Sequence, residues 1–171
     1  TPFPSESHAV WFGRNDTGNY SLNVNGPLSL GPQARAEAAR LRPMGADQGY
    51  PYGELISPQI PLPEGVSAVR VGFYFYREVE CYSQGSYDRT YVQVSFDGGV
   101  SWQTIWQLDS QNCWGMKQWM QPWSWDSGEW IKVAVPLEAT SMRIRFVFDA
   151  VDNVANNFLG WLIDDLVVAE A

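Results

Sequence analysis

The amino-acid sequence predicts an all-β protein in which two antiparallel sheets pack face to face as a sandwich, with jelly-roll connectivity as the expected topology. Most of the chain after residue 52 consists of short runs rich in Val, Ile, Phe and Tyr that alternate with polar residues, as strands with one buried face do. Gly, Pro and Asp-Gly pairs separate these runs and indicate turns. Strands do not alternate with helical segments, which argues against a parallel α/β fold.

The strands follow one another with turns between them, and roughly seven to nine are expected. They cover residues 9–13, 53–60, 69–80, 91–96, 101–108, 129–137, 141–149 and 160–168. Pro58 lacks an N–H and therefore places the second strand at a sheet edge. Good helix formers between Pro32 and Pro43 allow one short helix over residues 33–42. The side chains expected to face the core are Val69, Val71, Phe73, Phe75, Val92, Val94, Phe96, Ile131, Val133, Val135, Leu137, Ile144, Phe146 and Phe148.

The closing strand, residues 160–168, poses an electrostatic problem. It is apolar on both faces, so we expect it in the interior of a sheet, yet it holds two adjacent carboxylates, Asp164 and Asp165. Neighbouring side chains of a strand point to opposite faces, so one carboxylate points each way. A buried carboxylate without a partner is very costly, so at least one of them needs a cation, a basic side chain or several N–H donors.

Composition and motifs exclude several classes of protein. The 171 residues suit one domain over residues 1–171, and the net charge of −8 argues against nucleic-acid binding, which needs a basic face. No run of about 20 apolar residues is present that could span a membrane. Motifs for phosphate binding, dinucleotide binding, a serine nucleophile or a zinc protease are absent, and the single histidine, His8, has no nucleophile motif nearby. We therefore expect no catalytic activity, although a carboxylate pair serving a glycosidase is the enzymatic alternative.

The two cysteines, Cys81 and Cys113, both lie in polar, turn-rich segments. We expect them to form a disulfide with each other, which places the protein in a secreted, extracellular environment, outside the reducing cytosol. The alternative is two unrelated free thiols. Two cysteines alone do not make a zinc site.

Several carboxylates are candidates to share a site with the Asp164–Asp165 pair. They are Glu78, Glu80, Asp88 and Asp97, of which Glu80 and Asp88 flank one loop between neighbouring strands. Carboxylates that meet without basic partners repel each other unless a cation joins them, and a set of oxygen ligands without His or Cys favours calcium. The alternative is that arginines pair with these acids, the candidates being Arg70, Arg77, Arg89, Arg143 and Arg145.

Tryptophans are concentrated in one segment without a strand or helix pattern. Trp114, Trp119, Trp123 and Trp125 lie within residues 114–125. Exposed indoles on a loop stack on sugar rings or bind a protein surface, which predicts a ligand-binding site for a glycan or a cell-surface protein. The alternative is that these rings fold back and cap one end of the sandwich.

The order of several sequence blocks resembles the MAM-like jelly-roll domains of bacterial secreted proteins, as in immune inhibitor A-type peptidases, and is similar to the cleaved-adhesin domains of gingipain-type proteases. The blocks cover most of the chain, and the two most specific are residues 88–102, which contain Val-x-Val-Ser-x-Asp-Gly-Gly-x-Ser-Trp, and residues 160–168, which contain Gly-Trp-x-Ile-Asp-Asp. The others are residues 9–13, 53–62 and 73–80.

The resemblance implies a non-catalytic β-sandwich accessory domain, stabilised by calcium and attached to a larger secreted or cell-surface protein. The matching acidic positions imply metal ligands at Glu80, Asp88, Asp164 and Asp165. Glycans, cell-surface proteins or neighbouring domains of the same chain are the partners expected for such a domain. The tryptophan-rich segment lies outside the matching blocks, so a carbohydrate-binding role there would be particular to this chain.

Overall fold

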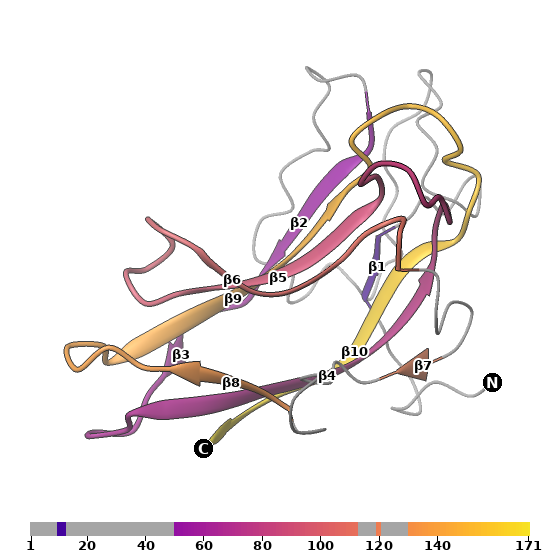
Figure 1. The fold of residues 1–171 in the computed structure, drawn as a ribbon. Helices are drawn as coiled ribbons and strands as arrows, with labels where there is room; N and C mark the ends of the chain where they lie inside the picture. The colour runs from indigo at the N-terminus through magenta and orange to yellow at the C-terminus, as the bar shows by residue number, and fades with distance from the viewer. Residues whose placement is uncertain (1–9, 13–49, 113–118, 121–129) are drawn as a thin grey trace.

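Strands and turns make up all of the chain that the computed structural model describes, which is residues 10–12, 50–112, 119–120 and 130–171 (Figure 1). The described residues form ten strands in two sheets, and every strand pair is antiparallel. The prediction of an all-β, two-sheet antiparallel sandwich is therefore confirmed. The short helix expected over residues 33–42 lies outside the described residues.

Each sheet has one long central pair of strands with shorter strands beside it (Figure 1). The first sheet contains β1 (Val10–Phe12), β10 (Gly160–Glu170), β4 (Ala68–Glu78), β7 (Trp119–Met120) and β8 (Ile131–Ala134), with β7 and β8 both paired to β4. The second sheet contains β2 (Tyr52–Ile56), β3 (Ile60–Pro61), β9 (Ser141–Asp149), β5 (Arg89–Ser95) and β6 (Gln103–Leu108), with β2 and β3 both paired to β9.

The strand order is that of a jelly roll. The first sheet runs β1-β10-β4-β8 and the second runs β2-β9-β5-β6, so the chain crosses between sheets repeatedly and its first and last strands become neighbours. The closing strand β10 lies between β1 and β4, in the interior of its sheet as expected. It pairs with β4 along most of its length and with β1 over residues 161–163.

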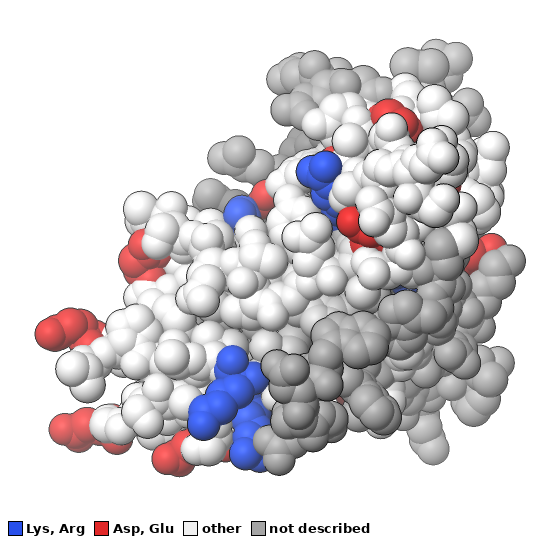
Figure 2. Space-filling model, viewed as in Figure 1, with Lys and Arg blue, Asp and Glu red and all other residues white. Residues whose placement is uncertain are grey.

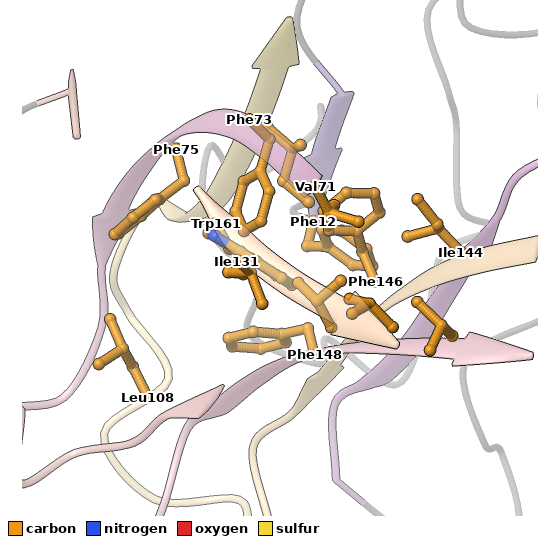
Figure 3. Close-up of a cluster of buried hydrophobic side chains, with 14 of the residues drawn as sticks. Phe12, Val71, Phe73, Phe75, Leu108, Ile131, Ile144, Phe146, Phe148 and Trp161 are labelled. Atoms are coloured by element: carbon orange, nitrogen blue, oxygen red, sulfur yellow. The ribbon is translucent and has the colours of Figure 1, made fainter. Parts of the chain in front are cut away.

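Aromatic side chains from both sheets meet in the core (Figure 3). Trp161 on β10 is completely buried and stacks on Phe12 of β1 at 5.3 Å between ring centroids. Across the sandwich Trp161 meets the ring of Phe146 on β9 edge-on, at 5.8 Å between centroids. Phe73 of β4 also meets the Phe146 ring edge-on, at 5.2 Å. The alternating apolar residues of β4, β5 and β9 all face this cluster, as the sequence predicts.

Two expected strand details are wrong. Leu137 was expected to face the core, but β8 ends at Ala134 and Leu137 is fully exposed on the turn that leads to β9. The expected strand over residues 53–60 is divided in two, because Ser57 leaves the ladder. The Ser57 hydroxyl accepts a hydrogen bond of 2.9 Å from the Ile144 N–H, and the Ser57 N–H donates to the Ile144 carbonyl.

A β-bulge divides the closing strand. Asp164 is opposite Tyr74 on β4, but Val167 is opposite Gly72, so β10 contains one extra residue between these pairs. Asp165, inside the bulge, has a left-handed backbone with φ of 49°. The extra residue reverses the alternation of side chains, so that Trp161 and Ile163 face the core before the bulge and Val168 packs against it afterwards. The expectation that both faces of this strand are covered throughout is therefore wrong, since Asp165, Leu166 and Val167 are exposed.

A glycine on β4 allows close packing on the outer face of the first sheet. Gly72 lies under the indole of Trp130, and a Cβ at this position would come within 2.4 Å of a ring atom. The glycine is buried and lies beside the bulge of β10. The absence of a side chain thus lets Trp130 lie directly against the strand.

The two ends of the sandwich differ in their connections (Figure 1). One end, here called the hairpin end, contains the turns at residues 62–67, 96–102 and 135–140. The opposite end, here called the loop end, contains the longer connections at residues 79–88 and 150–159 together with the turn at residues 109–112.

The buried indole of Trp161 generates a stability prediction. Replacement of Trp161 by Ala removes its contacts with rings of both sheets and leaves a cavity, so we expect a loss of about 3–5 kcal/mol in the free energy of unfolding, measured by chemical denaturation. The control is Leu166→Ala on the same strand, where the side chain is exposed and the loss should stay below about 1 kcal/mol. Equal losses for the two variants would contradict the assignment of Trp161 to the core.

Candidate functional site at the loop end

Backbone hydrogen bonds fasten the segments of the loop end to one another. The N–H of Tyr82 donates to the Ser110 carbonyl at 2.8 Å, and the N–H of Ser110 donates to the Tyr87 carbonyl at 2.8 Å. The N–H of Asp88 donates to the Ala150 carbonyl at 3.3 Å. Three segments that are far apart in sequence are thereby held as one corner, in which side chains can be positioned accurately.

Asp88 is the acidic side chain at the centre of this corner. It is buried, with 1% of its surface exposed, and its backbone is left-handed with φ of 45°, a conformation that Asp tolerates better than most residues. Its Oδ2 accepts a hydrogen bond of 2.8 Å from the N–H of Glu80. The contact confirms the expectation that Glu80 and Asp88 lie together at one end of β4 and β5.

A buried arginine lies beside the same residue. Arg77, the last residue but one of β4, donates from Nη2 to the Asp88 carbonyl at 3.0 Å and from Nη1 to the Asn112 carbonyl at 3.1 Å. The guanidinium therefore links the loop of residues 79–88 to the turn of residues 109–112 from beneath. It also brings a positive charge close to the Asp88 backbone, so the arginine alternative considered for the acidic residues stays open at this corner.

A second carboxylate acts on Glu80 from the connection between β9 and β10. Partial burial raises the pKa of the Glu80 carboxyl, and the negative charge of Asp152 raises it further. Asn156 in the same connection is 4% exposed, and its Nδ2 donates to the Asp152 carbonyl at 3.1 Å. Its side-chain oxygen is buried without a hydrogen-bond partner. The loop end thus contains polar oxygen atoms from two connections, and the side-chain oxygen of Asn156 is the one that lacks a hydrogen-bond partner.

The structure does not bring the Asp164–Asp165 pair to this corner. Asp164 is opposite Tyr74, four residues before the end of β4 at Glu78, which amounts to about 13 Å at the rise of a strand, and Glu80 follows in the connection beyond that end. Asp164 is largely buried and accepts a hydrogen bond of 2.8 Å from the N–H of Asp165, whereas Asp165 is exposed in the bulge. The four residues expected to share one metal site therefore lie in two separate places.

The described residues contain no group of three or more His, Cys, Asp or Glu side chains arranged to hold a metal ion. The Asp88 carboxylate contacts the backbone of Glu80 and not its carboxylate. A calcium ion held by these two side chains would need backbone carbonyls, amide oxygens or water for its remaining ligands. Asp97, considered from sequence for the same site, lies at the hairpin end. There its carboxylate accepts hydrogen bonds from Ser101 and Val100, which lower the pKa of Asp97 well below the ordinary value, the Ser101 hydroxyl having the largest effect.

Cys81 is exposed at the start of the loop that connects Glu80 to Asp88. It is bonded in a disulfide, and no described cysteine is free. Cys113 lies outside the described residues, so its pairing with Cys81 stays a prediction.

The tryptophans expected to bind a ligand are mostly outside the described residues as well. This holds for Trp114, Trp123 and Trp125, while Trp119 is placed only by its backbone, which pairs with Tyr76 of β4 in the short strand β7. The choice between exposed and buried rings in residues 114–125 therefore stays open.

Sequence reasoning missed a polar cluster on the outer face of the second sheet. The Arg145 guanidinium donates to Gln93 Oε1 at 2.6 Å and to Glu54 Oε1 at 3.2 Å, and it lies 4.4 Å from the ring centroid of Trp102. The Tyr52 hydroxyl also donates to Glu54. These residues share one face of adjacent strands, a pattern that the sequence shows only once the strand register is known.

Comparisons with known proteins add no relatives, since no protein-family model matches the chain and no match among curated proteins is found. No helix in the part of the chain that the structure describes is long and apolar enough to cross a membrane. The resemblance to MAM-like domains thus depends on the sequence blocks and on the jelly-roll strand order that they predict.

Removal of the Asp88 carboxylate generates the first prediction for this site. Asp88→Ala deprives the partly buried Glu80 N–H of its acceptor, so we expect a loss of about 1–3 kcal/mol in the free energy of unfolding, measured by urea denaturation. Asp165→Ala is the matched control, because Asp165 also has a left-handed backbone but is exposed. If the two variants lose the same amount, the backbone conformation and not the hydrogen bond explains the effect.

The tyrosines of the second sheet predict loss of stability in alkali. Burial raises the pKa of Tyr52, and the bond to Glu54 raises it further; burial and the charge of Asp149 raise the pKa of Tyr91. In the unfolded chain both phenols ionise at about pH 10. Their contribution to the free energy of unfolding is therefore fully present below that pH and is lost as the pH rises toward the higher pKa values of the folded state.

Replacement of Tyr52 by Phe removes one of these ionisations. Melting temperatures measured from about pH 9 to pH 11 should therefore fall less steeply for Tyr52→Phe than for the unchanged protein. Tyr82→Phe, which removes an exposed phenol, should fall in parallel with the unchanged protein. Parallel curves for all three proteins would contradict the argument.

Proposed function

We propose that this chain is a non-catalytic jelly-roll accessory domain of a larger secreted or cell-surface protein, stabilised by calcium at the loop end. The observation that carries the proposal is the corner where Glu80 and Asp88 meet, since its carboxylates, hydrogen bonds and disulfide all serve to fix one connection. The jelly-roll strand order supports the resemblance to MAM-like domains, which implies this role.

The Glu80 and Asp88 carboxylates are the side chains proposed to hold the ion. Asp152 adds a third negative charge close enough to raise the pKa of Glu80, and a divalent cation would relieve this repulsion. The unsatisfied oxygen of Asn156 lies in the same connection as Asp152. Asp164 and Asp165 leave the proposed ligand set, because Asp164 pairs with Tyr74, about 13 Å along β4 from its end at Glu78, and Asp165 lies one residue further away along β10.

A second account needs no metal. Arg77 is buried at the same corner and donates to the Asp88 carbonyl, so its guanidinium supplies positive charge close to Asp88. The two accounts differ in what a chelator does, because a guanidinium is not removed by chelation.

The disulfide supports an extracellular location. Disulfides persist in oxidising compartments and are rare in the cytosol, and Cys81 is exposed to solvent, where a reducing cytosol would reach it. We propose Cys113 as its partner, since the chain has two cysteines. The bond would then fasten the loop of residues 79–88 to the chain beyond β6.

The alternative function is that of a carbohydrate-binding module. In this account the rings of Trp114, Trp119, Trp123 and Trp125 bind a glycan, and the sandwich serves as their scaffold. As an accessory domain, by contrast, the chain would contact a cell-surface protein or the neighbouring domains of its parent.

Thermal unfolding with and without a chelator tests the calcium proposal. A ligand bound only to the folded state stabilises it, so EDTA should lower the melting temperature and added Ca²⁺ should restore it. Asp88→Ala should make the melting temperature insensitive to EDTA, whereas the control Asp165→Ala should keep the full response. Identical melting curves with Ca²⁺ and with EDTA would exclude the metal and leave Arg77 as the compensating group.

The same experiment in a reducing agent tests the disulfide separately. Reduction should lower the melting temperature of the unchanged protein by several degrees, and Cys113→Ser should reproduce that loss. An unchanged melting temperature in both arms would contradict the pairing and remove the support for an extracellular location.

A further inference from the structure

An open groove lies at the hairpin end, far from the acidic corner. It has a volume of about 400 Å³, within the usual range for small-molecule sites. The turn between β5 and β6 forms one wall, and the segment that connects β8 to β9 forms the other. The lining residues that the argument uses are Phe96, Asp97, Trp102, Gln103 and Glu138.

Trp102 is held rigidly in this groove. Its Nε1 donates to the Gly99 carbonyl at 3.1 Å, and the Arg145 guanidinium covers its ring at 4.4 Å from the centroid. Arg145 is itself fixed by Glu54 and Gln93. The indole is nevertheless partly exposed and lines the groove, so a ligand would meet an aromatic surface that is already in place.

The turn that forms the wall is also fixed in advance. Asp97 Oδ1 accepts hydrogen bonds from the N–H groups of Val100 and Ser101 at 3.0 and 2.9 Å, and Gly98 and Gly99 adopt the left-handed backbone that the turn requires. The Asp97 carboxylate is thus occupied within its own turn. Gln103 and Glu138 are exposed on the groove and offer an amide and a carboxylate to a ligand.

These groups fit a sugar better than other small ligands. The C–H face of a sugar ring packs on an indole, while its hydroxyls bond amide and carboxylate groups. Acidic side chains protrude where the turns of the hairpin end lie, at the left margin of Figure 2. The positive charge of Arg145 beside Trp102 is balanced by its ion pair with Glu54. The carboxylates of Asp97 and Glu138 line the groove and would repel an anionic sugar, so the charge favours a neutral one.

We propose that this groove binds a neutral hexose unit of a glycan, with Trp102 as the stacking surface and Glu138 and Gln103 as hydrogen-bond partners. The site is separate from the tryptophan-rich segment and depends neither on calcium nor on the disulfide. It adds a binding activity to the accessory role, because the hairpin end would contact a glycan while the proposed calcium corner lies at the opposite, loop end.

The test uses the complete 171-residue chain with the α-methyl glycosides of glucose, galactose and mannose, followed by saturation-transfer difference NMR, and with soluble glucan, galactan and mannan in calorimetry. We expect at least one sugar of the panel to bind. Trp102→Ala should weaken that binding by about tenfold or more, and Glu138→Gln by about fivefold, as expected for loss of a ring contact and of a charged hydrogen bond. Trp102→Phe should keep most of the affinity because it retains a stacking surface.

The control is Glu64→Gln, which removes an exposed carboxylate from a neighbouring turn that does not line the groove, and it should leave binding unchanged. Since Trp102→Ala also removes one of the contacts of Arg145, the folding of this variant is checked by circular dichroism, and Glu138→Gln tests the groove without that risk. The proposal is overturned if no sugar of the panel binds. It is also overturned if Glu138→Gln binds as tightly as the unchanged protein and Trp102→Phe loses as much affinity as Trp102→Ala. It is likewise overturned if Trp123→Ala and Trp125→Ala abolish binding while the groove variants retain it.

Discussion

The packing of aromatic rings between the two sheets is the interaction on which the rest of the structure depends. Trp161 of β10, Phe73 of β4 and Phe146 of β9 come from central strands, so the edges and connections are built around them. Because β10 is the last strand and β1 the first, the stacked pair of Trp161 and Phe12 also joins the two ends of the described chain. Both the loop end and the hairpin end are therefore positioned by one continuous core.

The bulge in β10 decides what the adjacent acids can do. In a regular strand Asp164 and Asp165 would point to opposite faces, but the extra residue turns Asp165 outward and lets its N–H bond the Asp164 carboxylate. The buried acid thus receives part of its compensation from its own neighbour. The calcium proposal therefore concerns only the corner of Glu80 and Asp88.

Alternating hydrophobicity predicted the sandwich, because β4, β5 and β9 each bury one face and expose the other. Asp97-Gly98-Gly99 predicted the hairpin between β5 and β6, because glycines adopt the left-handed backbone that this turn requires. The contact between Glu80 and Asp88 was predicted on the assumption that β4 and β5 pair, but these strands belong to different sheets and the loop between them crosses from one sheet to the other. The bulge, the exposed Leu137 and the Arg145 cluster were not predictable, since each depends on register between strands that are distant in sequence. Arg77 was foreseen only as one of five possible partners.

The contact between Gly72 and Trp130 has a consequence for sequence divergence. Because any side chain at residue 72 would occupy the space of the indole, the two positions form a single steric unit. A larger residue at one is tolerable only with a smaller residue at the other. Chains descended from a common ancestor with this one should therefore vary at these positions together, and a Gly–Trp pair at this spacing, next to an aromatic strand, would be a useful signature for finding them.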